Sequence, residues 1–246
     1  MSAVDYTVVL TSCGRFDLLV RTIRSFLAHA DIPPARFLVI EDSGNEAVRA
    51  ALAQVDAPIE VIVNSPQLGQ MKSIDKAYAT VDTPLIFHCE DDWEFFRSGF
   101  IAESAEVLAA RPDVSMVGLR PRAELNPRVR ELPAERLESG LSYIPFDPGL
   151  HPEYFSYSFN PGLRRTAEAK RFMPFDPRGG EEDVSWAFKQ EGFRIATLES
   201  PAVRHIGDER HVDDPTKRKK PKTVLERLAR STRKRWKRLR RMVGGA

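Results

Sequence analysis

The amino-acid sequence predicts an α/β fold, built as a mostly parallel sheet flanked by helices. Short runs rich in β-branched residues alternate with segments whose apolar residues recur at helical spacing, and this alternation is typical of right-handed βαβ units. Polar or acidic residues follow several of the β-like runs, as expected where parallel strands end beside a ligand. At 246 residues the chain is long enough for one large domain of this class.

The first half of the chain contains four strand-helix units. Residues 6–12 (YTVVLTS) and 36–42 predict buried strands, and apolar residues recur at helical spacing over 15–30 between them. The next predicted elements are a helix over 46–55, a strand over 59–63, a helix over 70–81, a strand over 84–89, a helix over 98–113 and a strand over 114–120. Ser98 is the expected N-cap of the helix that it begins.

The chain changes character after residue 112. Ten of the 18 prolines lie between residues 112 and 177, together with the aromatic residues Tyr143, Phe146, Tyr154, Phe155, Tyr157 and Phe159. We expect a loop-rich insertion here that builds the wall of a pocket. Helical spacing returns over 181–192, where Gly192 is the expected C-cap, and residues 194–198 and 202–206 predict short strands.

Cysteine usage and hydropathy suggest a compartment. Cys13 and Cys89 are the two cysteines, and the N-terminal sequence lacks the basic region of an export signal, so a disulfide framework is not expected. No apolar stretch approaches the roughly 18 residues that a membrane span needs. We therefore expect a cytoplasmic domain over residues 1–212.

A strongly basic tail follows this domain over residues 213–246. Residues 217–241 hold 14 of the 37 Lys and Arg residues but only one of the 35 acidic residues. If the tail is helical, one arc of about 100° contains Leu225, Leu228, Ala229, Thr232, Trp236, Leu239 and Val243. This pattern is typical of a basic amphipathic helix on an anionic membrane surface.

Three alternatives remain for the tail. It could be disordered and merely soluble, it could bind nucleic-acid phosphates, or it could pack on an acidic partner. Disorder alone would not arrange apolar residues in one stripe. The net acidic body and the lack of a recognisable reading module disfavour nucleic acid. We therefore expect a peripheral association with the inner face of a membrane and no binding of nucleic acid.

Polar side chains collect where the predicted parallel strands end. They are Thr11 and Ser12 after the first strand, Glu41 and Asp42 after the second, and Glu90, Asp91 and Asp92 after the fourth. The carboxyl ends of parallel strands meet at one edge of a sheet. Three adjacent carboxylates there suit a hard divalent cation that is shared with a substrate diphosphate. A solvated acidic turn before a helix is the alternative.

A second acidic motif begins the helix over 181–192. Glu181, Glu182 and Asp183 follow Gly179 and Gly180, which allow close approach of the backbone. A carboxylate in this position can act as general base toward a hydroxyl group. The alternative is the ordinary enrichment of acidic residues in a first helical turn.

Two weaker signals involve basic side chains. His205 ends a strand-like run and is a candidate metal ligand beside carboxylates, with His211 as its rival. Lys72 and Lys76 lie one helical turn apart behind a glycine-containing turn, where phosphate oxygens can bind. Lysines also commonly line solvated helix faces, so their spacing alone decides little.

Taken in order, these motifs resemble those of the GT-A fold (Rossmann-like) nucleotide-sugar glycosyltransferases of the inverting family-2 type. The resemblance covers residues 6–212 and rests on VVLTSCGR, LVIEDSGN, NSPQLGQMKSIDKAYA, CEDDW in place of the Asp-x-Asp motif, GEEDV and VRHIG. The chain departs from the family at Glu90, where Asp is usual, and at Glu41-Asp42-Ser43-Gly44, where Asp-Asp-Gly-Ser is usual. It also lacks the Gln-x-x-Arg-Trp motif of processive membrane synthases, so a single addition is expected.

The resemblance implies a role for each matched position. The base and ribose of the donor would be held by Thr11, Ser12, Glu41 and Asp42, with Gln70, Lys72 and Asp75 nearby. Asp92 would be the main ligand of Mn²⁺ or Mg²⁺ and His205 a further one, with Glu90 and Asp91 as neighbours toward ribose and metal. The acceptor side would consist of Asp183 as catalytic base, Glu182 as the orienting residue, and Ser158 and Asn160 beside the donor sugar.

The implied reaction is the transfer of one sugar from a nucleotide-sugar donor to a hydroxyl of a carbohydrate or lipid-linked acceptor. The anomeric configuration would be inverted, because the acceptor oxygen attacks opposite the leaving diphosphate while Asp183 takes its proton. A nucleotidyltransferase and a catalytically inactive, membrane-tethered GT-A binding module are the alternatives.

Overall fold

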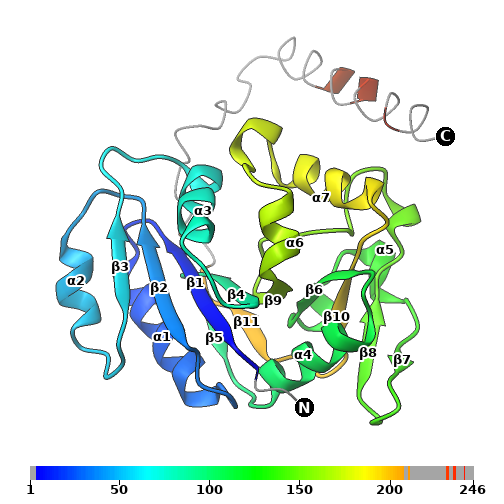
Figure 1. Cartoon of the computed structure of the whole chain (residues 1–246), viewed down its shortest axis with the longest axis horizontal. Coiled ribbons are helices and arrows are strands. Elements are labelled where there is room, and N and C mark those ends of the chain that lie inside the picture. The colour runs from blue at the N-terminus through cyan, green and yellow to red at the C-terminus, as the bar shows by residue number, and fades with distance from the viewer. Residues whose placement is uncertain (1–3, 208–209, 211–230, 233–234, 237–240, 242–246) are drawn as a thin grey trace.

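A nine-stranded sheet forms the centre of the computed structural model, which describes residues 4–207, 210, 231–232, 235–236 and 241 (Figure 1). The strand order is β3-β2-β1-β4-β9-β6-β10-β8-β7. The strands are β1 (Tyr6–Ser12), β2 (Arg36–Glu41), β3 (Glu60–Val63), β4 (Leu85–Glu90), β6 (Val114–Gly118), β7 (Glu135–Arg136), β8 (Ser142–Pro145), β9 (Gly162–Arg165) and β10 (Arg194–Leu198). A separate two-stranded sheet pairs β5 (Trp93–Phe95) with β11 (Val203–His205).

Parallel pairing dominates one half of the sheet. Strands β3, β2, β1 and β4 are parallel neighbours, as the alternation of strands and helices predicts. Strand β9 is antiparallel to both β4 and β6, and β10 runs parallel to β6. Strands β8 and β7 extend the far edge in antiparallel pairing. The proline-rich region thus supplies a strand to the centre of the sheet as well as loops.

Helices cover both faces of the sheet (Figure 1). The first face is covered by α1 (Phe16–His29), α2 (Ala47–Leu52) and α4 (Phe100–Ala110). The second face is covered by α3 (Gln70–Ala79), α6 (Thr166–Arg171) and α7 (Glu181–Gln190). A short α5 (Pro127–Arg130) and three 3-10 turns (Arg122–Glu124, Pro148–Leu150, Asp176–Arg178) lie among the loops.

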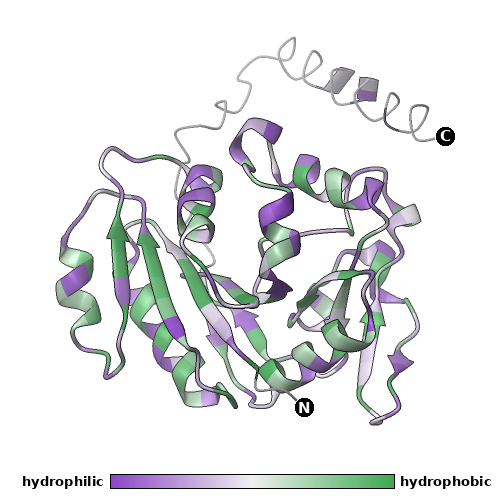
Figure 2. Ribbon diagram, in the orientation of Figure 1, coloured by the Kyte–Doolittle hydropathy of each residue, from purple (hydrophilic) through white to green (hydrophobic). Residues whose placement is uncertain are grey.

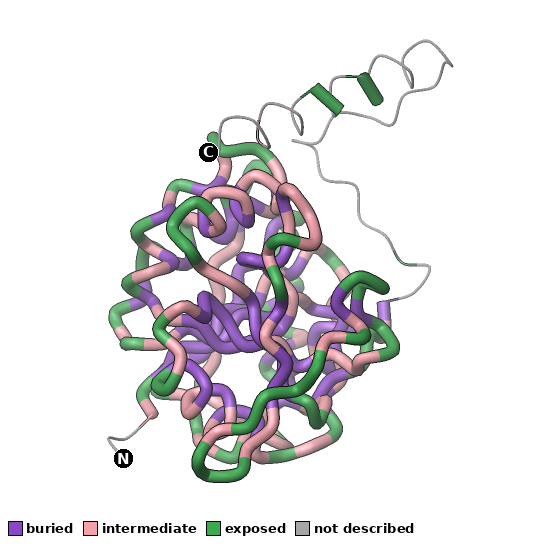
Figure 3. The backbone as a smooth tube through the Cα atoms, turned by 90° about the vertical axis from the view of Figure 1, so that its right-hand side faces the viewer, coloured by how far each residue is buried: buried purple, intermediate pink, exposed green. Residues whose placement is uncertain are grey.

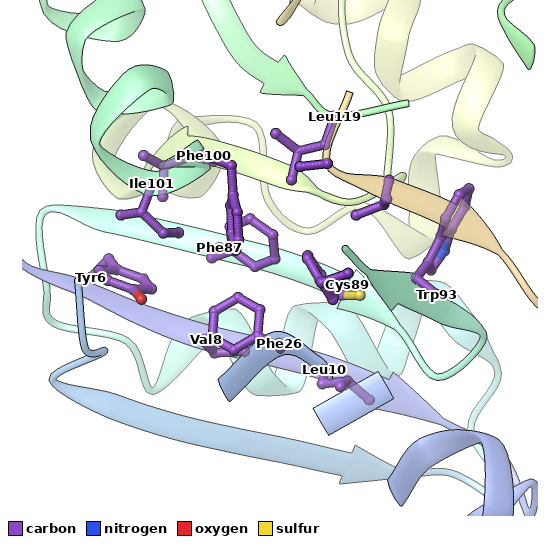
Figure 4. Packing of buried hydrophobic residues seen from close by; sticks show 14 of the residues in the cluster. Tyr6, Val8, Leu10, Phe26, Phe87, Cys89, Trp93, Phe100, Ile101 and Leu119 are labelled. Carbon is purple, nitrogen blue, oxygen red and sulfur yellow. The ribbon is translucent and has the colours of Figure 1, made fainter. Parts of the chain in front are cut away.

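Alternation along the strands separates two hydrophobic cores. In β1, Val8 and Leu10 face the α1 side, and Val9 faces the α3 side. Figure 4 shows Phe26 of α1 packed between residues of β1 and β4, with its ring centroid 5.1 Å from that of Phe87. Hydrophobic residues run along β2 and β3 in Figure 2, and Figure 3 shows the buried segments gathered in the middle of the molecule. Burial on both faces explains why β1 and β2 are nearly continuous apolar runs.

Two local predictions differ from the structure. Helix α2 ends at Leu52 instead of residue 55. Ser98 does not cap α4, because Gly99 precedes the helix and the Asp31 carboxylate accepts hydrogen bonds from Ile101 N and Ala102 N, both at 3.0 Å. Asp31 is 70 residues away in the chain, so local sequence does not reveal this cap.

Other predictions agree with the structure or lie outside it. Gly192 adopts a φ of +81° directly after the last turn of α7, as expected for a helix-ending glycine. Within the described part of the chain, no helix is long and apolar enough to cross a membrane. In the predicted tail helix, residues 231–232, 235–236 and 241 are helical, and the other positions from 211 onward lie outside the described residues.

Candidate active site

The carboxyl ends of β1, β2 and β4 lie side by side in the sheet. In the parallel register, Thr11 is opposite Glu90, and Ser12 is opposite Glu41. Ser12 Oγ donates a hydrogen bond to Asp91 Oδ2 at 3.1 Å. The strand-end polar groups therefore meet at one edge of the sheet, where open α/β sheets bind ligands.

Glu41 is fully buried at the end of β2. Its Oε1 accepts backbone hydrogen bonds from Gly14 N at 2.9 Å and Ser43 N at 2.8 Å. Its Oε2 is buried and has no hydrogen-bond partner among the residues that the structure describes. A buried carboxylate oxygen without a donor is unfavourable, so this atom is suited to a ligand that donates a hydrogen bond.

Asp42 instead organises the loop before α3. Its Oδ1 accepts from Asn64 Nδ2 at 2.9 Å and Leu68 N at 2.8 Å, and its Oδ2 accepts from Gly69 N at 2.8 Å. Lys76 Nζ in turn donates to Asn64 Oδ1 at 2.8 Å. Asp42 thus shapes the turn that begins α3, while one oxygen of its neighbour Glu41 has no partner within the described ranges.

Arg15 lies between two of the three adjacent acids after β4. Its guanidinium contacts Asp91 Oδ1, and its Nη2 lies 2.9 Å from Asp92 Oδ2. Asp91 is also held by Ser12, and its backbone oxygen accepts from Thr22 Oγ1 at 2.8 Å. The charge of Arg15 offsets part of the repulsion between the carboxylates. Asp91 is thereby fixed by α1 and β1.

The carboxylate of Asp92 is less fully hydrogen-bonded within the described residues than that of Asp91. His205 Nε2 lies 3.3 Å from Asp92 Oδ2, because the β5–β11 ladder places His205 opposite Trp93. Asp92 Oδ1 is buried and has no hydrogen-bond partner within the described ranges. Gly207 packs so closely that a Cβ there would lie 2.5 Å from Asp92 Oδ2.

These residues fit a divalent cation. No group of three or more His, Cys, Asp or Glu side chains in the described part of the chain is arranged as a complete metal cage. A site with one carboxylate, one imidazole and substrate phosphate oxygens needs no such cage. Asp92 Oδ1, which has no hydrogen-bond partner among the described residues, and the imidazole of His205 are the two protein donors that such a site would use.

Glu90 differs chemically from the two aspartates that follow it. Gln70 Nε2 donates to Glu90 Oε1 at 2.8 Å. Burial, together with the nearby charges of Asp92, Glu181 and Asp91, raises the pKa of Glu90 to about 8. Glu181 belongs to the acidic residues that begin α7, so charges from both acidic segments contribute to this shift.

The acidic residues that begin α7 are packed against two glycines. A Cβ on Gly179, whose φ is +115°, would lie 2.3 Å from Asp183 Oδ2, and one on Gly180 would lie 2.4 Å from Glu182 Oε2. Asp183 Oδ2 accepts a hydrogen bond from Gly180 N at 3.2 Å. The predicted close approach of backbone at this motif is therefore present.

Glu181 connects α7 to the segment that contains Ser158 and Asn160. Its Oε1 accepts from Ser158 Oγ at 3.3 Å, and its Oε2 accepts from Phe159 N at 3.3 Å. Asn160 Nδ2 donates to Ser158 Oγ at 2.7 Å. Burial raises the pKa of Glu181, although Ser158, Phe159 and Arg164 oppose the shift. These residues form one polar network on the α7 side.

Two residues predicted near the donor have other contacts here. Both carboxylate oxygens of Asp75 accept from backbone amides, at 2.8 and 2.9 Å from Phe175 N and at 3.0 Å from Asp176 N. Lys72 is exposed, with Nζ 3.9 Å from Asp176 Oδ2. Asp75 thus fixes the loop before α7 in addition to any contact with a ligand.

A cavity of about 220 Å³ opens beside Glu181. Its wall is largely apolar and contains Leu125, Val129, Phe146, Tyr154, Phe155 and Ile195. Its polar and charged members are Arg120, Asn126, Ser158, Asn160, Glu181 and Thr197. Phe155 has a φ of +81°, which is a strained conformation for a residue with a bulky side chain. Most of this wall comes from the proline-rich region, as the sequence predicts for a pocket.

Sequence reasoning missed three residues that organise the site. Arg15 follows the end of the predicted strand over residues 6–12, and this position indicates a residue near the ligand-binding edge of the sheet. Glu181 was visible in the acidic motif but was not distinguished from its neighbours. Arg164 had no signal: it is fully buried on β9 and donates to Tyr157 OH at 3.2 Å and to the backbone oxygens of Ser158 and Asn160, both at 3.0 Å.

Comparison with known proteins identifies the fold. No family model matches the sequence, and no curated protein matches it. Among solved structures, the mannosyltransferase PcManGT from Pyrobaculum calidifontis, in complex with GDP-Man and Mn²⁺, is similar with a TM-score of 0.59 and 13% identity. The match covers 83% of this chain and 58% of that one.

Two further structures show the same likeness. GalNAc-T7 with UDP, GalNAc and Mn²⁺ has a TM-score of 0.59 and 13% identity over 83% of this chain and 44% of its own. Residues 1–349 of S. aureus TarS give a TM-score of 0.56 and 14% identity over 81% and 59%. This chain therefore spans about half the length of these structures, and it has the GT-A fold that the sequence predicts.

Proposed function

We propose that this chain is a metal-dependent glycosyltransferase that moves one sugar from a nucleotide-sugar donor to an acceptor hydroxyl with inversion. The observation that carries the proposal is the buried Asp92 Oδ1 beside His205, at the edge where β1, β2 and β4 end. This oxygen has no hydrogen-bond partner in the part of the chain that the structure describes. Similar folds have been solved with GDP-Man or UDP and Mn²⁺, which supports the same class of ligand here.

Each side of the site has a distinct task in this proposal. Glu41 Oε2 accepts a hydrogen bond from the base or ribose, and Thr11, Ser12 and Gln70 line the same end. Asp92 and His205 hold Mn²⁺ or Mg²⁺, which neutralises charge on the leaving diphosphate when bound. Asp42 and Asp75 keep the loops before α3 and α7 in place.

Asp183 is the proposed catalytic base. It takes the proton of the acceptor hydroxyl as that oxygen bonds to the anomeric carbon, and the bond from this carbon to the diphosphate breaks. Glu182 orients the acceptor, and the cavity beside Glu181 receives its apolar part. The apolar wall supports an acceptor with a hydrophobic group, as a lipid-linked carbohydrate has.

Two substitutions test the enzyme proposal. Asp92→Asn removes the ligand charge and is expected to lower Mn²⁺-dependent release of nucleoside diphosphate by about 100-fold or more. Asp183→Asn is expected to abolish transfer and leave donor binding intact. The exposed Asp82→Asn is the matched control and keeps full activity. Unchanged turnover in the Asp183 variant across all tested donors would remove its assignment as base.

The products discriminate the alternatives. A nucleotidyltransferase would release pyrophosphate instead of a nucleoside diphosphate. An inactive GT-A binding module would bind a sugar nucleotide, seen as raised thermal stability, without consuming it. A screen of nucleotide sugars with and without Mn²⁺ or Mg²⁺ provides both measurements.

We further propose that residues 1–212 form the transferase domain and that the basic residues 217–241 attach it to an anionic membrane surface. The charge of that segment supports the idea. Co-sedimentation with anionic and neutral liposomes, for the whole chain and for residues 1–216, tests it. Equal pelleting of the whole chain and of residues 1–216 with anionic liposomes would contradict the proposed membrane attachment.

A further inference from the structure

The guanidinium group of Arg241 contacts Asp183, the proposed catalytic base. Arg241 contacts Asp183 Oδ1 through Nη2, and its Nη1 donates to Glu153 Oε1 at 2.7 Å. The Cζ of Arg241 lies 4.6 Å from the ring centroid of Trp186. One cation is thus surrounded by two carboxylates and an aromatic face, although these three partners come from two separate segments of the chain.

The pocket around this cation is well shielded from water. Relative exposures of the side chains are 5% for Glu153, 11% for Asp183 and 13% for Arg241. Two carboxylates so little exposed repel each other unless a cation lies between them. Trp186 adds a face that attracts a guanidinium or ammonium group.

We infer that Glu153, Asp183 and Trp186 form a binding site for a guanidinium or ammonium group, and that Arg241 of the same chain occupies it. The partners are supplied by two segments of the domain. Asp183 and Trp186 lie on α7, and Glu153 is buried in the loop that His151 closes by accepting from Glu153 N at 3.1 Å. The cation site therefore belongs to the domain, and Arg241 is its tethered ligand.

The site has a consequence for catalysis that rests on the proposed function. While Asp183 Oδ1 accepts a hydrogen bond from Arg241, Asp183 is not available to take the proton of an acceptor hydroxyl. An acceptor must displace this guanidinium, which removes its positive charge from the space between Glu153 and Trp186. An acceptor that carries its own ammonium or guanidinium group near the reacting hydroxyl restores that balance. Cationic acceptors are thus the favoured class.

Arg241 and an external cation compete for the same three residues. A tethered group acts at an effective concentration of about millimolar, so a free cation binds the intact chain weakly. Removing the Arg241 side chain is expected to tighten binding of the free cation by about 10-fold or more. In the intact chain, the apparent dissociation constant equals the intrinsic constant divided by the fraction of molecules whose site is vacant, and the substitution makes every site vacant.

Tryptophan fluorescence with arginine amide as the probe tests the site without donor, metal or turnover. All variants carry Trp236→Phe, and Trp186→Phe identifies the responding residue. Arg241→Ala is expected to bind the probe about 10-fold more tightly than the parent. Arg235→Ala removes an equal charge from an exposed position of the same tail and is expected to match the parent. Sodium chloride at equal ionic strength corrects for screening.

Two more variants keep the test decisive. Adding Glu153→Gln to Arg241→Ala is expected to remove the gain in affinity. Arg241→Lys keeps the charge but not the forked geometry, so it gives an intermediate affinity and serves if Arg241→Ala unfolds on heating. Equal affinities for Arg241→Ala and Arg235→Ala, or no response that depends on Trp186, overturn the inference. If arginine amide binds as expected but the protein consumes no sugar nucleotide, the proposed function is overturned and the cation site is not.

Discussion

Gly207 packs against the carboxylate of Asp92, and a Cβ on Gly207 would lie 2.5 Å from Asp92 Oδ2 and 2.6 Å from Asp92 Cβ. No substituent fits at that separation unless Asp92 moves. The glycine that follows β11 is therefore required for the position of the candidate metal ligand, because β11 and β5 hold the two segments together.

Gly207→Ala is expected to weaken Mn²⁺ binding about 10-fold, since it displaces Asp92 from its present position. Electron paramagnetic resonance of free Mn²⁺ measures this affinity directly. Gly118→Ala is the control, because its Cβ would meet no atom closer than 3.6 Å. If both variants bind Mn²⁺ like the parent, Asp92 is not a ligand held by this contact.

Arg15→Gln is expected to raise Mn²⁺ affinity in the absence of nucleotide by roughly 3- to 10-fold. The guanidinium that contacts both Asp91 and Asp92 competes electrostatically with a metal cation. Binding of a nucleoside diphosphate is expected to weaken in the same variant, because one cation near the phosphates is lost. Calorimetric titrations of metal and nucleotide separate the two effects.

Arg21→Gln provides the comparison for Arg15. Arg21 lies on α1, the helix that begins directly after Arg15, and it pairs with Glu94, with its side chain 52% exposed. The Arg21→Gln substitution removes the same charge at a distance from Asp91 and Asp92. The affinities for Mn²⁺ and for the nucleoside diphosphate are therefore expected to stay within twofold of the parent. Equal changes of these affinities in Arg15→Gln and Arg21→Gln would contradict the prediction, because they would show an effect of net charge and not of the contacts of Arg15.

Cys13 is expected to react slowly with iodoacetamide. Burial, together with the charges of Glu41, Asp42 and Asp91, raises the pKa of the Cys13 thiol to about 11. Less thiolate is present at pH 8 than for an ordinary thiol, so alkylation should be roughly 100-fold slower than for a free cysteine. The rate should continue to rise above pH 9.5. Mass spectrometry with Cys13→Ser as control assigns the product.

His88→Phe is expected to stabilise the protein by about 1 kcal/mol. His88 is fully buried between Tyr78 and Phe159, and both ring nitrogens lack hydrogen-bond partners among the described residues. A phenyl ring keeps the aromatic contacts and removes two unsatisfied polar atoms. Urea unfolding at pH 7 measures the difference.

The same substitution is expected to change the acid limb of the stability curve. Burial lowers the pKa of His88 well below its usual range, and the Arg164 charge adds to the shift. The unfolded chain takes up a proton below about pH 6.5 and the folded chain does not, so stability falls as the pH decreases, by up to about 1.4 kcal/mol per unit. His88→Phe removes this contribution, whereas His29→Gln, at the end of α1, should retain it.

The order of elements was predictable from the sequence because it depends on local burial. Strands β1 and β10 begin and end where the apolar runs do, and α1 follows its helical periodicity within one residue at each end. The strand-end acids were predictable for a related reason. Parallel strands place their carboxyl ends at one edge, so Ser12, Glu41 and Asp91 meet without further information.

Contacts between distant segments were not predictable from local patterns. Strand β9 enters the sheet between β4 and β6 in an antiparallel direction, although its four residues carry two arginines and look unlike a central strand. Arg164 is tolerated there because backbone oxygens and Tyr157 accept its hydrogen bonds. Burial of a charge requires partners, and those partners come from a loop folded back over the strand.

The sequence by itself determined the α/β class, the parallel first half of the sheet and the place of the acidic motifs, because periodicity reports which face of each element is buried. The tertiary structure decided how those acids differ. It fixed Asp91 with Arg15, left Asp92 Oδ1 without a partner among the described residues, raised the pKa of Glu90 to about 8 and brought Arg241 into contact with Asp183. Identical carboxylates acquire different chemistry from neighbours that only packing brings together.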